Sequence, residues 1–295
     1  MEKDLGRINL HNHGIVALVD KMGSDEAIEE SARISYGANK EVVKQSSQRD
    51  LLRYLFRHKH TSPFEQAEVK FYLKLPIFVM RQLVRHRTAN INEISGRYKT
   101  LSDEMFVPNR EDIKPQSSDN KQGRAGELDD IEKDGSVLTF QESNNIAYNL
   151  YSLLLGDQSD EFVEERFGPC FPGIAKELAR IVLPLGTYTE IYWKCDLHNF
   201  FHMLKLRTDP HAQKEIRDYA NAMYELAKPH FPISTEAWED YSRDAVIFSR
   251  MERDYLRLLI NSHPFALDDN FMKQNGMTKR EILEFKDKLA WRGNR

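Results

Sequence analysis

The sequence of 295 residues predicts an α/β (α+β) fold in which helices flank a sheet. Hydrophobic residues recur at helical spacing in several separate segments, which predicts amphipathic helices. In residues 68–76 they alternate with polar residues instead, which predicts a half-buried strand. The sequence contains no G-x-G-x-x-G turn after a strand, no Walker A motif and no G-x-S-x-G motif. A bound dinucleotide would therefore not lie in a Rossmann crevice.

The first half of the chain predicts two helices, one strand and a third helix. Residues 26–36 and 50–58 both show helical spacing, and the second segment carries a single apolar stripe. The strand over 68–76 ends at Pro76, which can serve as the first residue of a helix over 76–87.

Residues 108–136 differ in composition from the rest of the chain. They are charged and glycine-rich, and they contain almost no large apolar side chains. Such a segment cannot offset the entropy of ordering by burial. We therefore predict a mobile insertion, which is either a tolerated surface insertion or a lid over a site.

The second half of the chain predicts one further strand among helices. The strand covers residues 189–195, and helices are expected over 137–155, 174–185, 197–207 and 211–228. Pro184 ends or kinks the second of these helices. After about residue 232, no pattern indicates chemistry.

The composition restricts the class of protein. Hydrophobic residues make up 40% of the chain, which is enough for a core, and the formal net charge is -4. Nucleic-acid binding needs a broad basic surface, so we expect no nucleic-acid partner. The two cysteines, Cys170 and Cys195, give no disulfide framework. Without a signal-peptide core or a membrane-spanning apolar stretch, we expect a cytoplasmic protein without membrane contact.

A basic cluster stands out in this acidic chain. Residues 81–99 hold five basic residues against one acidic residue: Arg81, Arg85, Arg87, Arg97 and Lys99 against Glu93. If 76–87 is one mostly apolar helix, its buried arginines need a matching anion. The planar guanidinium group can bind two phosphate oxygens at once. We therefore predict a phosphate-bearing ligand, and the local charge favours two phosphate groups.

Three further arginine-bearing segments belong to the same hypothesis. The stretch Ser95-Gly96-Arg97 offers a hydroxyl, a glycine that lets backbone N–H groups approach an anion, and a guanidinium. Arg180 either joins the site or forms an internal ion pair with Glu177. Arg207 either joins the site or complements the dipole at the end of its helix.

Two histidines raise the question of a metal site. His198 and His202 lie four residues apart, with Asp196 just before them, a spacing that a metal could use. No H-E-x-x-H or paired C-x-x-C pattern is present, so we expect no metal ion. His60 gains significance only from the residues that surround it in the fold.

Taken together, these segments resemble the flavin-dependent thymidylate synthases. The stretch RHRTANINEIS, residues 85–95, matches the family signature of Arg-His-Arg, seven residues and Ser. The segments SARISY, HTSPFE, PIFVMRQLVRHR, SGRYK, ELARIVLPL and LRTDPHAQKEIR also resemble the family's blocks, in the family's order. The resemblance covers about residues 14–228 and leaves out the insertion 108–136 and the tail.

The resemblance implies an enzyme that methylates dUMP to dTMP. Its carbon donor would be 5,10-methylenetetrahydrofolate, its reductant NADPH, and its hydride relay FAD. The implied fold has a central antiparallel-rich sheet flanked by helices, and the implied assembly is a homotetramer with active sites at subunit interfaces. We expect a catalytic domain over residues 1–230, containing the insertion 108–136, and a C-terminal helical extension of unknown role over 231–295.

The resemblance also implies roles for individual residues. Arg207, which would meet the uracil, and His60, beside the flavin ring, would be catalytic. The dUMP ligands would be Arg81, Gln82 and Arg180 from one subunit, with Glu93, Ser95, Gly96 and Arg97 from a neighbour. FAD would be held by Ser35, His60, Ser62, Glu65, Arg85, His86, Arg87, Glu93, Asp196, His198, His202 and His211.

The sequence departs from the family at a few of these positions. Asp196, His198 and His202 stand where members often carry Asn, Arg and Asn, and Gln66 replaces a frequent His. These departures affect the expected flavin contacts around residues 196–202, not the expected reaction.

Two other classes of protein remain as alternatives. A flavin-free thymidylate synthase would use a cysteine nucleophile, but Cys170 has only Arg166 nearby to lower the pKa of its thiol. A nucleic-acid-binding protein would need a basic and aromatic stacking platform, which the sequence does not show.

Overall fold

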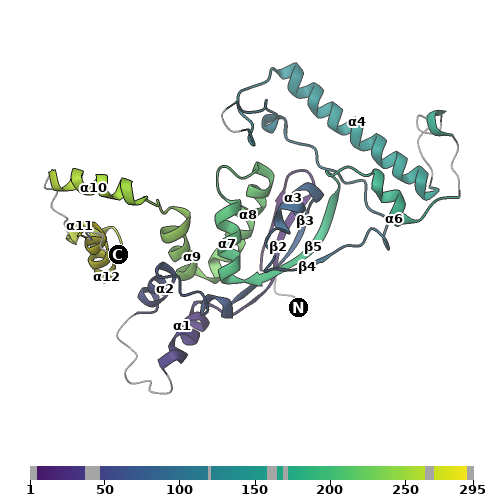
Figure 1. Cartoon of the computed structure of the whole chain (residues 1–295). Helices are drawn as coiled ribbons and strands as arrows, with labels where there is room; N and C mark the ends of the chain where they lie inside the picture. Colours follow the sequence, from purple (N-terminus) through teal and green to yellow (C-terminus); the bar gives the residue numbers. More distant parts are fainter. Residues whose placement is uncertain are drawn as a thin grey trace.

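A five-stranded antiparallel sheet forms the centre of the fold (Figure 1). The computed structural model describes residues 5–36, 47–118, 121–157, 165–168, 172–262 and 269–290. The strands are β1 (Arg7–Leu10), β2 (Gly14–Met22), β3 (Glu68–Pro76), β4 (Asn90–Glu93) and β5 (Tyr188–Asp196), in the spatial order β1-β2-β3-β5-β4. All of these neighbours pair antiparallel, so the predicted α/β (α+β) class with an antiparallel-rich sheet is confirmed.

The two predicted strands, β3 and β5, pair along their whole length at the middle of the sheet. The other three strands were missed by the sequence pattern. The alternation in β2 is interrupted by a bulge between Leu18 and Asp20. β4 contains a single apolar residue, Ile91, and is a strand because it pairs with β5 at the edge of the sheet. The alternation of apolar and polar residues alone cannot detect such a strand.

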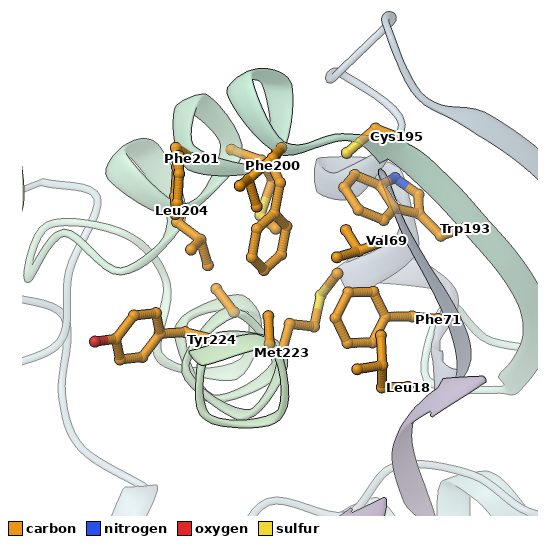
Figure 2. Close-up of a cluster of buried hydrophobic side chains, with 14 of the residues drawn as sticks. Leu18, Val69, Phe71, Trp193, Cys195, Phe200, Phe201, Leu204, Met223 and Tyr224 are labelled. Carbon is orange, nitrogen blue, oxygen red and sulfur yellow. The ribbon is translucent and has the colours of Figure 1, made fainter. Parts of the chain in front are cut away.

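Two helices, α7 (Leu197–Arg207) and α8 (Lys214–Ala227), cover one face of the sheet (Figure 1). The alternation in β3 turns Val69 and Phe71 towards these helices, where both are fully buried. Figure 2 shows Val69, Phe71 and Trp193 of the sheet in one cluster with Phe200 of α7 and Met223 of α8. Burying each such side chain contributes about 1.5–3 kcal/mol. This packing fixes the rotation of α7 about its axis.

The remaining helices gather at two places (Figure 1). At one end of the sheet lie α1 (Asp25–Arg33), α2 (Gln48–Arg57) and α9 (Pro232–Trp238), whereas α4 (Asp130–Leu155) and α6 (Lys176–Ala179) extend on the opposite side. The C-terminal helices α10 (Arg250–Ser262), α11 (Asp269–Gln274) and α12 (Lys279–Ala290) lie beyond α9. Phe231 and Trp238 belong to the buried core, so α9 is packed with the helices that precede it. The predicted boundary at residue 230 stays a prediction.

The helix expected over 76–87 is shorter than its pattern suggested. α3 (Ile77–Leu83) ends at Leu83, and the next backbone bonds run from Arg85 to Gln82 and from His86 to Leu83. These three-residue steps tighten the chain into a turn. The prediction that Arg85 to Arg87 lie on a helix is therefore wrong.

The helix expected over 174–185 is also shorter. It consists of α6 followed by a 3-10 turn over Arg180–Val182. Pro184 disfavours the helical conformation of the residue before it, and Leu183 is indeed extended, at φ -71° and ψ 137°.

The predicted insertion 108–136 has defined contacts over its described part. Its last residues form the start of α4, because Asp129 and Glu132 form a capping box. Upstream, Arg124 donates to both carboxylate oxygens of Glu215, at 2.6 and 2.8 Å, and Glu215 is buried on α8. Ion pairs rather than apolar burial thus attach the segment to the body of the protein. Its mobility and its use as a lid stay predictions. None of the described helices is long and apolar enough to cross a membrane.

Candidate active site

The basic turn after α3 leaves its arginines free of acidic partners. Arg81, on α3, and Arg85 and Arg87, in the turn, are exposed, and none forms an ion pair within the part of the chain that the structure describes. The prediction that these arginines are buried on an apolar helix, and need an anion for that reason, is therefore wrong. The reason is instead that three guanidinium groups keep their N–H donors available, in a geometry that suits phosphate oxygens.

Arg207, the last residue of α7, is held against this turn from two directions. Its Nε donates to Nε2 of His86 at 3.0 Å, and its Nη2 donates to the backbone oxygen of Gln82 at 3.1 Å. The side chain is partly buried, and Nη1 has no partner among the described residues. Arg207 is therefore more than a cap for its helix dipole. It presents a fixed guanidinium edge beside the basic turn.

His86 is the residue that orients this guanidinium. Its side chain is buried, with 8% of the residue exposed. Burial, followed by the positive charge of Arg207 and by His202, lowers the pKa of His86 to about 4. The ring is therefore neutral at pH 7, and since Nε2 accepts from Arg207, the proton lies on Nδ1. A direct contact between His86 and FAD stays a prediction.

The buried neutral state of His86 predicts a pH dependence of stability. Between the ordinary histidine pKa of about 6.5 and the folded value of about 4, the unfolded chain binds a proton that the folded chain does not. Stability therefore falls as the pH drops through this window, by at most about 3 kcal/mol from this residue. Urea denaturation at pH 7 and pH 4.5 should show a smaller pH effect for His86→Gln than for the unsubstituted protein. Equal pH effects would contradict the assignment.

Three histidines predicted to face the flavin do come together in the fold. His60 follows α2, and His198 and His202 lie one turn apart on α7; all three line a hollow of about 260 Å³, called here the histidine hollow. Lys59 and Lys205 line it as well, and no carboxylate does among its described lining residues. The hollow therefore favours an anionic ligand.

The chemistry of the histidine hollow fits a flavin. Its remaining lining is largely aromatic, with Phe56, Phe64, Phe201 and Trp238. Aromatic walls suit a flat ring system, and imidazole and ammonium groups suit its polar edge and its phosphates. In the described part of the chain no group of three or more His, Cys, Asp or Glu side chains could hold a metal ion.

A second hollow, of about 290 Å³, contains Glu93, Gly96 and Arg180 and is called here the Arg180 hollow. The Cδ of Arg180 lies 3.2 Å from where a side-chain carbon on Gly96 would stand, so a larger residue at 96 would crowd the guanidinium. The internal pair of Arg180 with Glu177 is wrong, because Glu177 accepts instead from Nε of Arg97 at 2.9 Å. Arg180 thus has no acidic partner among the described residues.

A third hollow, of about 510 Å³, lies between the end of α7 and the C-terminal extension, and is called here the C-terminal hollow. Arg207 and His211 line it from one side, and Tyr241, Arg243 and Ile247 from the other. His211 is exposed, and its Nδ1 lies 2.9 Å from Oδ1 of Asp209. Arg207 therefore lines a hollow that the C-terminal extension also lines.

Several other predicted ligands are engaged within the chain itself. Asp196 caps α7, with Oδ1 accepting from the backbone of Asn199 at 2.8 Å, and its contact with FAD stays a prediction. The Ser95 hydroxyl accepts from the backbone of Arg97 at 3.3 Å, and none of the histidines or lysines in the described ranges bonds to it. The side-chain amide of Gln82 donates to Gln213 at 2.7 Å.

Three of the predicted flavin ligands lie outside the hollows. Ser35, Ser62 and Glu65 are exposed, and none of them lines the histidine hollow or the Arg180 hollow. Glu93, by contrast, is fixed by a hydrogen bond of 2.6 Å from the Thr189 hydroxyl. The predicted ligands that share one of these two hollows are therefore the three histidines in the first, and Glu93, Gly96 and Arg180 in the second.

Sequence reasoning missed Lys59, Lys205, Trp238 and Ser242 as lining residues. Lys205 carried a usable signal, since it lies on the same helix as His198 and His202 and faces away from the apolar stripe. Trp238 and Ser242 had no signal in the sequence, because only the packing of α9 beside α7 brings the C-terminal extension to the site.

The fold and the site fit one class of protein: an α/β enzyme without a Rossmann crevice, whose exposed arginines and basic hollows suit anionic nucleotides. Residues 17–233 match the family described as thymidylate synthase complementing protein. The flavin-dependent thymidylate synthase of Treponema denticola is 46% identical over 277 residues, which cover 94% of each chain. That of Dictyostelium discoideum is 40% identical over 291 residues, or 95% of this chain and 86% of its own.

A solved structure shows the same fold. The UMP/dUMP methylase PolB from Streptomyces cacaoi, bound with 5-Br dUMP, superimposes with a TM-score of 0.65 at 29% identity, over 80% of this chain and 99% of its own. This chain belongs to the family of flavin-dependent thymidylate synthases.

Proposed function

We propose that the protein carries out the reductive methylation of dUMP to dTMP, with 5,10-methylenetetrahydrofolate as carbon donor, NADPH as reductant and FAD as the flavin. The observation that carries this proposal is the group of Arg81, Arg85 and Arg87, which form no ion pair with any residue that the structure describes, beside Arg207, which is hydrogen-bonded to His86 and to the backbone of Gln82. The turn supplies cations for phosphate groups, and Arg207 supplies a fixed cation for the nucleobase.

The proposed role of Arg207 follows from the chemistry of the base. Methylation at C5 of uracil requires that carbon to become nucleophilic, so negative charge develops on the carbonyl oxygens of the ring. A guanidinium already fixed by His86 and Gln82 stabilises that charge without reorganising. Partial burial strengthens the interaction, because less water competes for the guanidinium.

The residues of the histidine hollow are proposed to hold the flavin ring. His60, His198 and His202 would orient it, and Arg85 and Arg87 would bind its pyrophosphate. Bound FAD supplies the hydride chemistry, while the protein binds, orients and excludes water. The remaining proposed ligands are Ser35, Ser62, Glu65, Glu93, Asp196 and His211.

We also propose a homotetramer in which each site is shared between subunits. Within one chain, Glu93, Gly96 and Arg180 line a different hollow from His60, His198 and His202. The resemblance groups Arg180 with Arg81 and Gln82. Because Arg180 shares its hollow with Glu93 and Gly96, we propose instead that it reaches dUMP together with Glu93, Ser95, Gly96 and Arg97. Exposed apolar side chains around α4 and α6 offer surface for such contacts: Leu138, Phe140, Leu178, Ile181 and Leu185.

The test of the function is tritium release from 5-tritiated dUMP, run with NADPH and methylenetetrahydrofolate, with and without added FAD. We expect release that depends on both co-substrates and on flavin, in a yellow protein with the absorption of an oxidised flavin. A protein that stays colourless after incubation with FAD, and that releases tritium without NADPH, would refute the proposal.

A cysteine nucleophile is not expected to take part. Cys195 is buried, and burial raises the pKa of its thiol well above the ordinary value, so it is a poor nucleophile. Cys170 lies outside the described residues. We predict that Cys170→Ala keeps dTMP formation within about twofold of the unsubstituted protein, as for a substitution away from the chemistry. Loss of tritium release in a folded Cys170→Ala protein would favour the flavin-free mechanism.

A further inference from the structure

The C-terminal helix α12 contacts the end of α2, the helix that leads directly to His60. α10, α11 and α12 lie beyond α9 and α2, away from the sheet (Figure 1). The family match ends at residue 233, before these helices begin. Nothing in the proposed reaction assigns α12 a role.

His60 is attached to α2 by the way this helix ends. Lys59 adopts a left-handed conformation, with φ +59°. The backbone N–H of Lys59 then donates to Phe56 at 3.1 Å, and that of His60 donates to Leu55 at 2.9 Å. These two bonds form a Schellman motif, which closes the helix end. The backbone of His60 therefore follows any shift of the last turn of α2.

An ionic contact from α12 holds that last turn. Oε2 of Glu284 accepts from Nε of Arg57 at 2.6 Å, and Oε1 accepts from Nη2 of Arg57 at 3.1 Å. The same Oε1 lies 3.2 Å from Nε2 of His58. Burial raises the pKa of Glu284, but the hydrogen bonds and charges of Arg57 and His58 outweigh it and lower this pKa to about 2. Glu284 thus contacts Arg57 and His58, the two residues that precede the Schellman turn.

An aromatic contact reaches the side chain of His60 as well. The guanidinium of Arg280 lies 3.8 Å from the centre of the Tyr54 ring. On α2, the Tyr54 ring is 6.0 Å from the His60 ring, with an angle of 29° between them. Arg280 also donates to Glu284 at 3.3 Å, so the ionic and aromatic contacts are joined on α12.

We propose that Arg280 and Glu284 of the C-terminal extension are positioning residues that set the orientation of His60 in the histidine hollow. The ring of His60 is fixed on one side by Tyr54, which Arg280 covers. Its backbone is fixed by a helix end that Glu284 holds. The role assigned to His60 rests on the proposed function, but the placement of His60 by α12 does not.

The test compares Arg280→Ala/Glu284→Gln with Asp287→Asn, in the full-length protein loaded with FAD. Asp287 is an exposed acid on the same helix and forms no hydrogen bond or ion pair with the described residues of α2. Glu284→Gln keeps the size of the side chain, and Arg280 is mostly exposed, so neither change leaves a cavity in the core. Hydrogen exchange of the His60 amide, kcat and KM for dUMP are measured together.

We expect the double variant to exchange the His60 amide about tenfold faster and to lower kcat about tenfold, with KM for dUMP unchanged, the size of effect seen for coupled networks. Asp287→Asn should change none of these. Arg57→Glu should show the same defect, and adding Glu284→Arg should restore slow exchange and kcat.

The inference is overturned if the double variant has a lower Tm but normal kcat and normal exchange at His60, because α12 would then only stabilise α2. It is also overturned if exchange rises equally at α8, because the effect would not be local. The proposed function has a separate test: it fails if the unsubstituted protein forms no dTMP. The hydrogen exchange of the His60 amide would still show in that case whether α12 positions His60.

Discussion

Arg207→Ala is expected to lower kcat/KM for dUMP by about 10²–10³-fold, the loss typical of removing one fixed group that stabilises developing charge. With the described residues, the side chain of Arg207 forms two hydrogen bonds that the variant loses, to His86 and to the backbone of Gln82. Their loss costs at most about 1–3 kcal/mol of stability. The variant should therefore fold, assemble and bind flavin, but turn over slowly.

The control for this prediction is Arg217→Ala. Arg217 is a half-buried arginine on α8 that donates to a backbone oxygen, that of Pro210, at 2.8 Å. Its removal costs a comparable hydrogen bond and should leave kcat/KM unchanged. The kcat/KM of Arg207→Lys should lie between that of the unsubstituted protein and that of Arg207→Ala, because an ammonium group keeps the charge but lacks the planar guanidinium fork. If Arg207→Ala turns over dUMP at the normal rate, another group stabilises the charge on the base.

The basic cluster was evident in the sequence, but the reason for which it was expected to need an anion was wrong. Helical spacing placed Arg81 and Arg85 on one buried face, whereas α3 ends at Leu83 and both arginines are exposed. The end of a helix depends on competing hydrogen bonds, such as those that the backbone oxygen of Gln82 accepts from the backbone of Arg85 and from the side chain of Arg207. The spacing of apolar residues does not encode these bonds. The excess of positive charge over residues 81–99 does not depend on where the helix ends, so this part of the prediction is unaffected.

Contacts between distant segments account for the other differences. β4 exists because β5 offers it an edge, and the buried position of His86 exists because Arg207 lies across it, 121 residues later. Strands β3 and β5 were predictable, since their apolar faces are buried by α7 and α8 and so must alternate. A residue whose role comes from a remote partner leaves no such local signature.

The C-terminal extension illustrates this limit most clearly. Its sequence showed no chemistry, yet its acidic residues match an arginine series on α2. Arg49, Arg53 and Arg57 recur every four residues, so they share one face of that helix, where like charges would repel. Carboxylates from Glu236, Asp240, Glu281 and Glu284 neutralise this face. This charge complementarity between α2 and the C-terminal extension is apparent only in the folded structure, where the two segments are in contact.

Arg53→Leu is expected to destabilise the protein by about 3–5 kcal/mol, the usual cost of removing one partner from a buried ion pair. Arg53 is 4% exposed. Nε and Nη2 donate to Glu281 at 3.1 and 2.9 Å, and Nη1 donates to Glu236 at 2.8 Å and to Asp240 at 2.5 Å. Leucine fills part of the space but leaves these carboxylates without their shared cation. Urea denaturation followed by tryptophan fluorescence measures the loss.

Arg49→Leu provides the matched control, because Arg49 also pairs with Glu236 on the same helix face but is 39% exposed. An exposed pair contributes only about 0–1 kcal/mol, so this variant should be nearly as stable as the unsubstituted protein. The double variant Arg53→Leu/Glu281→Leu should recover part of the loss, since it also removes Glu281, the buried carboxylate that loses its pairing with Arg53. Equal losses for Arg49→Leu and Arg53→Leu would show that water reaches Arg53. The C-terminal extension would then be attached to α2 by its apolar contacts, not by this ion network.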